Sequence, residues 1–126
     1  MRLNTIAHWM LFVALSGAVT AQVTLRKGAK VYHGSAANTT APATVKERKV
    51  RAATPEWQKI EDEGIDTQSA RGKQLITKMN TRIRKAIKAV ADSESCDMVT
   101  RKKDLKDDRG RSVVDLTDKV IGELKA

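Results

Sequence analysis

The sequence is poor in the residues from which most catalytic and metal sites are built. Its 126 residues include one Cys and two His, and aromatic residues make up 3% of the chain. A single Cys excludes a disulfide framework and a four-cysteine zinc site, and two His do not build a histidine metal site unaided. The sequence holds no glycine-rich phosphate loop and no nucleophile elbow. We therefore expect no catalytic residues, no metal or other cofactor, and no enzymatic activity.

The N-terminal residues have the pattern of a secretory signal peptide. Arg2 precedes a largely apolar stretch over residues 6–19, and a Val-Thr-Ala step ending at Ala21 places short side chains before a cut at Gln22. The stretch is shorter than the roughly 20 apolar residues that a membrane span needs. We predict that residues 1–21 are a signal peptide and that the mature protein is periplasmic or secreted. An uncleaved N-terminal anchor is the alternative.

Acidic residues are scarce relative to basic ones. Lys and Arg total 24 and Asp and Glu total 15, which gives a formal net charge of +9. Such an excess favours anionic partners. Specific binding of nucleic acid is not expected, because only Tyr32 and Trp57 would remain as platforms for base stacking once residues 1–21 are removed.

The mature chain begins with a segment that has little to bury. Residues 22–42 are mainly small and polar, and they predict a flexible leader with a short hairpin around Gly28. A short strand is predicted at residues 43–45. A helix is then expected between Thr54, which can cap it, and Gly64, which can end it.

The clearest element is a long amphipathic helix over residues 70–91. Its apolar positions fall within about 120° of arc at 100° per residue, and they are Leu75, Ile76, Met79, Ile83, Ala86, Ile87 and Val90. The other side carries seven cations and no acid between residues 71 and 88: Arg71, Lys73, Lys78, Arg82, Arg84, Lys85 and Lys88. We predict that these cations form a binding surface for an anionic partner, and a merely solvated helix face is the alternative.

The C-terminal part predicts further short strands and a short closing helix. Residues 97–100 have the pattern of a strand, and a second strand is expected at Leu105 or at Val113 and its neighbour. The closing helix is expected after Asp115 or Thr117. The fold class is therefore α+β, a small body of short strands with one long amphipathic helix and a short C-terminal helix.

Three stretches of the chain, in their order, resemble the Skp/OmpH family of periplasmic chaperones. They read TVKERKVRAATPEWQKI (44–60), RGKQLITKMNTRIRKAIKAVADSESCDMV (71–99) and VVDLTDKVIGEL (113–124). The family has a first strand, a helix opening near a small-Pro-Glu step, a long helix, a strand and a capped short helix. Its last three motifs match Ala89-Val90-Ala91, Asp97-Met98-Val99 and Asp115-Leu116-Thr117-Asp118.

This resemblance implies an OmpH-like domain over residues 43–126, completed by trimerisation around a central assembly body. Long-armed members enclose unfolded outer-membrane proteins between coiled-coil arms. Here the arm region, residues 61–74, is too short for such arms. The candidate residues of the assembly body are Val45, Met98, Val99, Leu105 and Val113.

The sequence is compatible with two functions. The first is an OmpH-like binding protein or chaperone whose partners are unfolded outer-membrane proteins or other envelope proteins. The alternative is a basic extracytoplasmic scaffolding protein that binds anionic envelope polymers or lipid head groups. Cys96 is expected to be a small buried residue, and a thiol near a subunit interface is the alternative.

Overall fold

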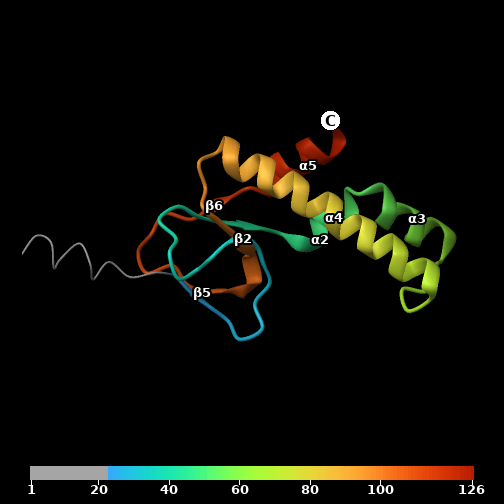
Figure 1. The fold of residues 1–126 in the computed structure, drawn as a ribbon, viewed down its shortest axis with the longest axis horizontal. Coiled ribbons are helices and arrows are strands. Elements are labelled where there is room, and N and C mark those ends of the chain that lie inside the picture. The colour runs from blue at the N-terminus through green and yellow to red at the C-terminus, as the bar shows by residue number, and fades with distance from the viewer. Residues whose placement is uncertain (1–22) are drawn as a thin grey trace, which may run out of the picture.

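The computed structural model describes residues 23–126, so the predicted signal peptide and its cleavage point lie outside the described residues. The fold is α+β, as the sequence predicts (Figure 1). The strands are β1 (Thr24–Leu25), β2 (Val31–Gly34), β3 (Pro42–Val45), β4 (Met98–Arg101), β5 (Leu105–Asp107) and β6 (Val114–Asp115). The helices are α2 (Glu47–Ala52), α3 (Pro55–Glu63), α4 (Ala70–Ser93) and α5 (Thr117–Lys125), with a 3-10 turn, η1, at Lys102–Asp104.

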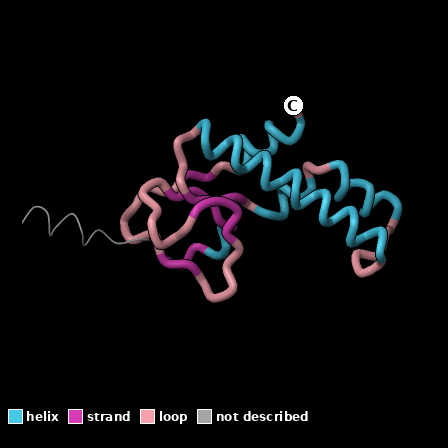
Figure 2. The backbone as a smooth tube through the Cα atoms, viewed as in Figure 1, coloured by secondary structure: helices cyan, strands magenta, loops and turns pink. Residues whose placement is uncertain are grey.

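Four strands form one mixed sheet in the order β2-β4-β3-β6. Figure 2 shows the strands gathered in one part of the molecule, with the helices beside and beyond them. The central strands β3 and β4 are parallel, with Val45 opposite Arg101, and β6 pairs in parallel with the other side of β3. Strand β2 closes one edge by antiparallel pairing with β4. Because β3, β4 and β6 run in the same direction, their carboxyl ends meet at one edge of the sheet.

The segment predicted as a flexible leader is instead part of the body. Strand β2 pairs with β4, and β1 pairs with β5 in a separate two-stranded ribbon. Gly28 lies in the turn between β1 and β2 with a φ of 76°. The ring of Tyr32 enters the main core, and Val23 and Thr39 are also buried. The prediction was wrong because distant partners, which the composition of residues 22–42 does not reveal, supply the pairing and the burial.

Asp97 fastens the loop between β2 and β3 to the start of β4. Its carboxylate accepts hydrogen bonds from the Thr39 hydroxyl, from the backbone N–H and hydroxyl of Thr40, and from the backbone N–H of Ala41. Burial would raise the pKa of Asp97, but these hydrogen bonds outweigh it and hold the pKa well below the usual range. The loop is therefore fixed by one carboxylate that lies far away in sequence.

Helix α4 buries one side against the sheet and the neighbouring helices, as its periodicity predicts. Met79, Ile83 and Ile87 are buried in the main core, together with Val99 of the sheet and Leu116 beside α5. The C-terminal half of α4 covers the sheet, whereas its N-terminal half extends beyond the sheet with α3 alongside (Figure 1). The molecule thus has a sheet body and a short helical projection.

Capping residues lie at both ends of α3 and at the start of α4. The hydroxyl of Thr54 accepts a hydrogen bond from the backbone N–H of Trp57 at 3.3 Å, and Gly64 ends α3 with a φ of 59°. Ser69 caps α4 by accepting from the N–H of Gly72 at 3.1 Å. These contacts confirm the predicted start and end of α3, and they show what fixes the start of α4.

The closing segments contain both of the strands that the sequence offered as alternatives. Leu105 begins β5 and Val114 begins β6. Helix α5 starts after Leu116, and the Asp115 carboxylate accepts from the N–H of Thr117 at 2.9 Å. Cys96 is buried, which is the first of its two predicted settings, and burial raises the pKa of its thiol.

Candidate functional site

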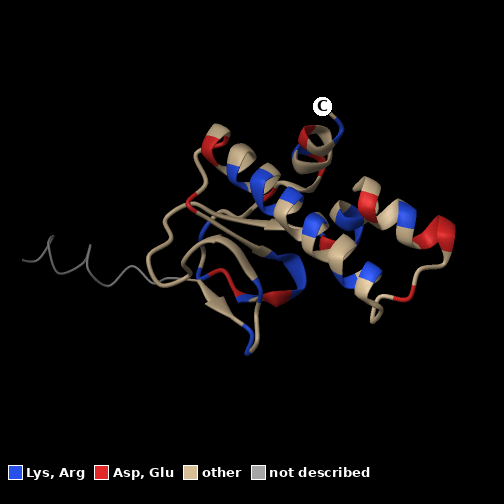
Figure 3. Cartoon of the chain, turned by 45° about the vertical axis from the view of Figure 1, so that its right-hand side comes forward, with Lys and Arg blue, Asp and Glu red and all other residues tan. Residues whose placement is uncertain are grey.

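All seven predicted cations of α4 lie on its exposed side. Each of the seven is exposed: Arg71, Lys73, Lys78, Arg82, Arg84, Lys85 and Lys88. The core positions of the helix that lie between them in sequence are buried. Figure 3 shows Lys and Arg recurring along α4, while acidic residues gather at the far end of α3. The helix thus separates an apolar side from a basic side, as the sequence predicts.

Three of the seven cations have partners. Arg71 donates to Glu63 at 3.0 Å, and Arg82 donates from Nε to Glu56 at 2.7 Å. Both acids come from α3, so the acidic stretch before the long helix folds back onto it. The guanidinium of Arg84 lies 5.8 Å from the centre of the Tyr32 ring, a cation–π contact. These three side chains therefore have structural contacts besides any role in binding.

The other four cations form a surface that we call the lysine face, made of Lys73, Lys78, Lys85 and Lys88. None of them makes an ion pair within residues 23–126. At 100° per residue they lie within about 140° of the helix circumference. Their positive charge is consequently directed at solvent with no internal acid to offset it.

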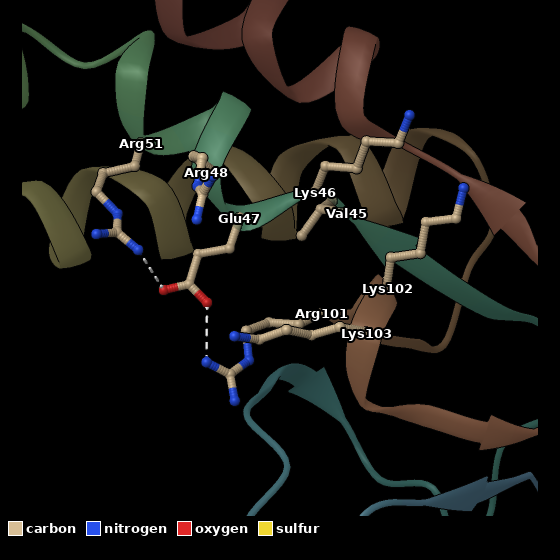
Figure 4. A pocket seen from close by; sticks show the side chains of 8 residues that line it. All are labelled: Val45, Lys46, Glu47, Arg48, Arg51, Arg101, Lys102 and Lys103. Atoms are coloured by element: carbon tan, nitrogen blue, oxygen red, sulfur yellow. Dashed lines mark hydrogen bonds and ion pairs between the residues drawn. The ribbon is translucent and has the colours of Figure 1, made fainter.

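A second basic region was not predicted: a pocket of about 320 Å³ beside the carboxyl ends of β3 and β4. We call it the strand-end pocket. Val45, the last residue of β3, lies in its wall, and the remaining lining residues come from the β3–α2 junction, from α2 and from the junction of β4 with η1 (Figure 4). Those residues are Lys46, Glu47, Arg48, Arg51, Arg101, Lys102 and Lys103.

Glu47 organises one wall of the strand-end pocket. Its carboxylate lies 3.1 Å from a guanidinium nitrogen of Arg51 and 3.1 Å from one of Arg101, and Figure 4 shows it reaching between the two. Lys30 lies 4.0 Å away on the same carboxylate. Burial would raise the pKa of Glu47, but the Arg101 hydrogen bond and the three nearby cations outweigh it and lower the pKa. Glu47 is therefore ionised at neutral pH.

Arg101 is held from two sides. Its Nε donates to Asp104 at 2.5 Å while Nη1 donates to Glu47 at 3.1 Å. Asp104 also accepts from the backbone N–H of Lys30 at 2.9 Å, which ties the pocket to the turn before β2. The guanidinium of Arg101 is thus fixed in place without a ligand.

The five candidate residues of the assembly body do not lie in one surface. Val45, Met98 and Val99 are buried in adjacent strands of the sheet, and Val45 and Val99 belong to the main core. Leu105 lies in the separate ribbon of β1 and β5, and Val113 precedes β6 outside any strand. The side chains of three of the five are therefore already buried within one chain.

The comparisons add no relative: no family model, curated protein or solved structure matches the chain. Within residues 23–126, no cluster of His, Cys, Asp and Glu is placed to hold a metal ion. In the same part of the chain, every helix falls short of the length and apolar character that crossing a membrane requires.

Proposed function

We propose that this chain is an extracytoplasmic OmpH-like binding protein that holds unfolded outer-membrane or other envelope proteins, working as a homotrimer without catalysis. The observation that carries the proposal is the lysine face. Four exposed lysines, which make no ion pair with any other described residue, lie on one side of a helix whose other side is fixed in the core. A rigid array of like charge attracts partners of opposite charge over about a Debye length, roughly 8 Å in physiological salt.

The order of the elements supports the family part of the proposal. Strand β3, helices α3 and α4, strand β4 and helix α5 follow one another at the residues that carry the resemblance. The helical projection, made of α3 and the N-terminal half of α4, takes the place of an arm. Because α3 spans only nine residues, a partner would be held along the lysine face of α4 and not enclosed.

Trimerisation would strengthen the attraction. Three copies of the lysine face on one particle would add their fields, and an unfolded chain could contact more than one copy at once, which raises its overall affinity. The short edge strands of the body would also gain pairing partners in an assembly. A trimer is expected to have three times the mass of the mature chain in light scattering.

One observation favours the second candidate, a scaffolding protein for anionic envelope polymers or lipid head groups. Val114 is the sole large hydrophobic side chain that is exposed within residues 23–126. A single chain therefore offers charge rather than apolar surface to a partner, and charge alone does not distinguish an unfolded protein from a polyanion.

Light scattering on an unfolded, acidic outer-membrane protein separates the two candidates. A chaperone suppresses aggregation in moderate salt, whereas a polyanion binder fails there and sediments with envelope material at low salt. The informative variant is Lys78→Glu/Lys85→Glu/Lys88→Glu, which reverses three residues of the lysine face. We leave Arg82 unchanged, because its loss would leave the buried Glu56 carboxylate without the hydrogen bond that Arg82 donates.

The matched control reverses three exposed lysines elsewhere, Lys27, Lys59 and Lys106, none of which makes an ion pair in the described chain. Both triple variants change the net charge equally. We expect the lysine-face variant to lose suppression and the control to keep most of it, with helix content and oligomer mass unchanged in both. Equal loss in the two variants, or a solution mass of one chain, would contradict the proposal.

A further inference from the structure

We propose that the strand-end pocket is a binding site for a small phosphate-bearing anion, of the pyrophosphate or phosphomonoester class. Six cations line the pocket against one carboxylate, that of Glu47. When the outside partners Asp104 and Asp115 are included, six cations still face three acids. Three of the six cations make no ion pair in the described chain, and these are Lys46, Arg48 and Lys103.

The place of the pocket in the fold supports a ligand site. In sheets with parallel strands, ligands bind beside the carboxyl ends of the strands. Val45 and Arg101 are the paired last residues of β3 and β4, and both line the pocket. The basic residues therefore come together through strand pairing, with Glu47 and Arg101 separated by 54 positions in sequence.

The size of the pocket restricts the ligand. Its volume of about 320 Å³ is at the lower end of the range of roughly 300–1,000 Å³ that ligand pockets occupy. That space suits a single phosphate or pyrophosphate group with a small substituent. A long polyanion would contact the pocket with one group only.

The side chains suit phosphate in particular. Arginine presents planar N–H donors that match phosphate oxygens, and lysine adds mobile positive charge. Arg101 is already positioned by Glu47 and Asp104, so a ligand would not have to order it. Arg48 and Lys103 are exposed and make no ion pair within residues 23–126, so they would supply charge that no acid of this part of the chain already offsets.

The inference is independent of the proposed function, because no residue of α4 lines the pocket. The test is isothermal titration of the purified protein with sodium pyrophosphate in low salt. The variant Arg48→Gln/Lys103→Gln removes two pocket cations that make no ion pair in the part of the chain that the structure describes. The control Lys49→Gln/Lys106→Gln removes two exposed cations outside the pocket, one of them adjacent in sequence to Arg48.

We expect the parent protein to bind one pyrophosphate per chain and the pocket variant to bind at least about tenfold more weakly, since two charge-assisted contacts are lost. The control should stay within about twofold of the parent. Thermal unfolding without ligand should be alike for all three proteins, because the substituted side chains are exposed. Absence of binding by the parent, or an equal loss in the pocket variant and the control, would overturn the proposal.

A second arm of the test identifies the source of the phosphate. Sedimentation with vesicles containing phosphatidic acid presents a phosphomonoester on a lipid, whereas pyrophosphate is free in solution. If the pocket variant binds both pyrophosphate and the vesicles more weakly than the parent does, the site accepts a phosphate on a membrane surface as well. If only pyrophosphate binding falls, the ligand is a soluble phosphate compound. Both results support the pocket, and indifference to the variant in both arms contradicts it.

Discussion

The lysine face and the strand-end pocket carry the same charge in opposite arrangements. The lysine face is formed by one helix, and its four cations make no ion pairs in the described chain. The pocket is concave, joins two distant segments, and has an ionised acid, Glu47, that fixes Arg51 and Arg101. An open row of lysines suits long-range attraction of an extended partner, whereas ordered guanidinium groups in a cavity suit recognition of one compact anion.

The largest expected effect tests whether α4 turns its apolar side to the core and its lysine face to solvent. Ile87 is fully buried, and its neighbour Lys88 is exposed on the lysine face. Ile87→Asp would bury an unpaired charge, so we expect a loss of about 4 kcal/mol or more in unfolding free energy. Lys88→Asp should change it by less than about 1 kcal/mol. Chemical denaturation of both variants measures the difference, and equal losses would mean that the sides of α4 are misassigned.

The second prediction compares the acid inside the strand-end pocket with a cation of the lysine face. Glu47→Gln removes the charge that Arg51 and Arg101 share, and these side chains are only partly exposed. We expect a loss of about 2 kcal/mol, below the range for fully buried pairs because water screens part of the interaction. Lys85→Gln should cost less than about 0.5 kcal/mol. If the two substitutions have the same effect, the pocket is not built around Glu47.

The third prediction concerns the contact that joins α3 to α4. Glu56 is buried and binds Arg82, which is about half exposed. Glu56→Gln should destabilise the fold by about 1 kcal/mol, since a hydrogen bond from a charged donor is weakened but a polar acceptor remains. Thermal unfolding of this variant beside Glu63→Gln, whose pair with Arg71 is exposed, provides the comparison. We expect Glu63→Gln to be close to neutral.

The smallest effect is a pH dependence that separates the two regions. Because the pKa of Glu47 is lowered in the folded protein, its contribution to stability is complete above its unfolded pKa, about 4.3. The contribution is lost as the pH falls through the folded pKa. Between pH 6 and pH 3, Glu47→Gln should therefore lose less stability than the parent. Substitutions on the lysine face should leave the acid dependence of unfolding unchanged, and a parallel change there would contradict the assignment.

The parts of the fold that depend on local chemistry were predictable from the sequence. The periodicity of α4, the Thr54 and Gly64 signals of α3 and the strand near Met98 all lie where the residues indicate. Helix α2 was missed because its six residues bury only Val50 and lack a side-chain cap. Such a helix is stabilised by its neighbours and leaves almost no periodic signal in the sequence.

The two basic regions also differ in how far the sequence could predict them. The lysine face could be read from spacing on one helix, although the pairing of Arg71 and Arg82 with α3 could not, because it depends on how the two helices pack. The strand-end pocket had no sequence signature. It exists because β3 and β4 pair in parallel and bring two charged segments together, and single-sequence patterns do not specify which strands pair.

The most direct test of the central claim is the affinity for an unfolded, acidic outer-membrane protein at low and at moderate salt. The parent should bind tightly at low salt and still bind measurably at moderate salt, with an affinity that falls as salt rises because the lysine face attracts its partner electrostatically. The variant Lys78→Glu/Lys85→Glu/Lys88→Glu should bind at least about tenfold more weakly at low salt, with a shallower salt dependence, while the control at Lys27, Lys59 and Lys106 stays near the parent. If the lysine-face variant binds as well as the parent at both salt concentrations, the lysine face is only a solvated surface and the account is wrong.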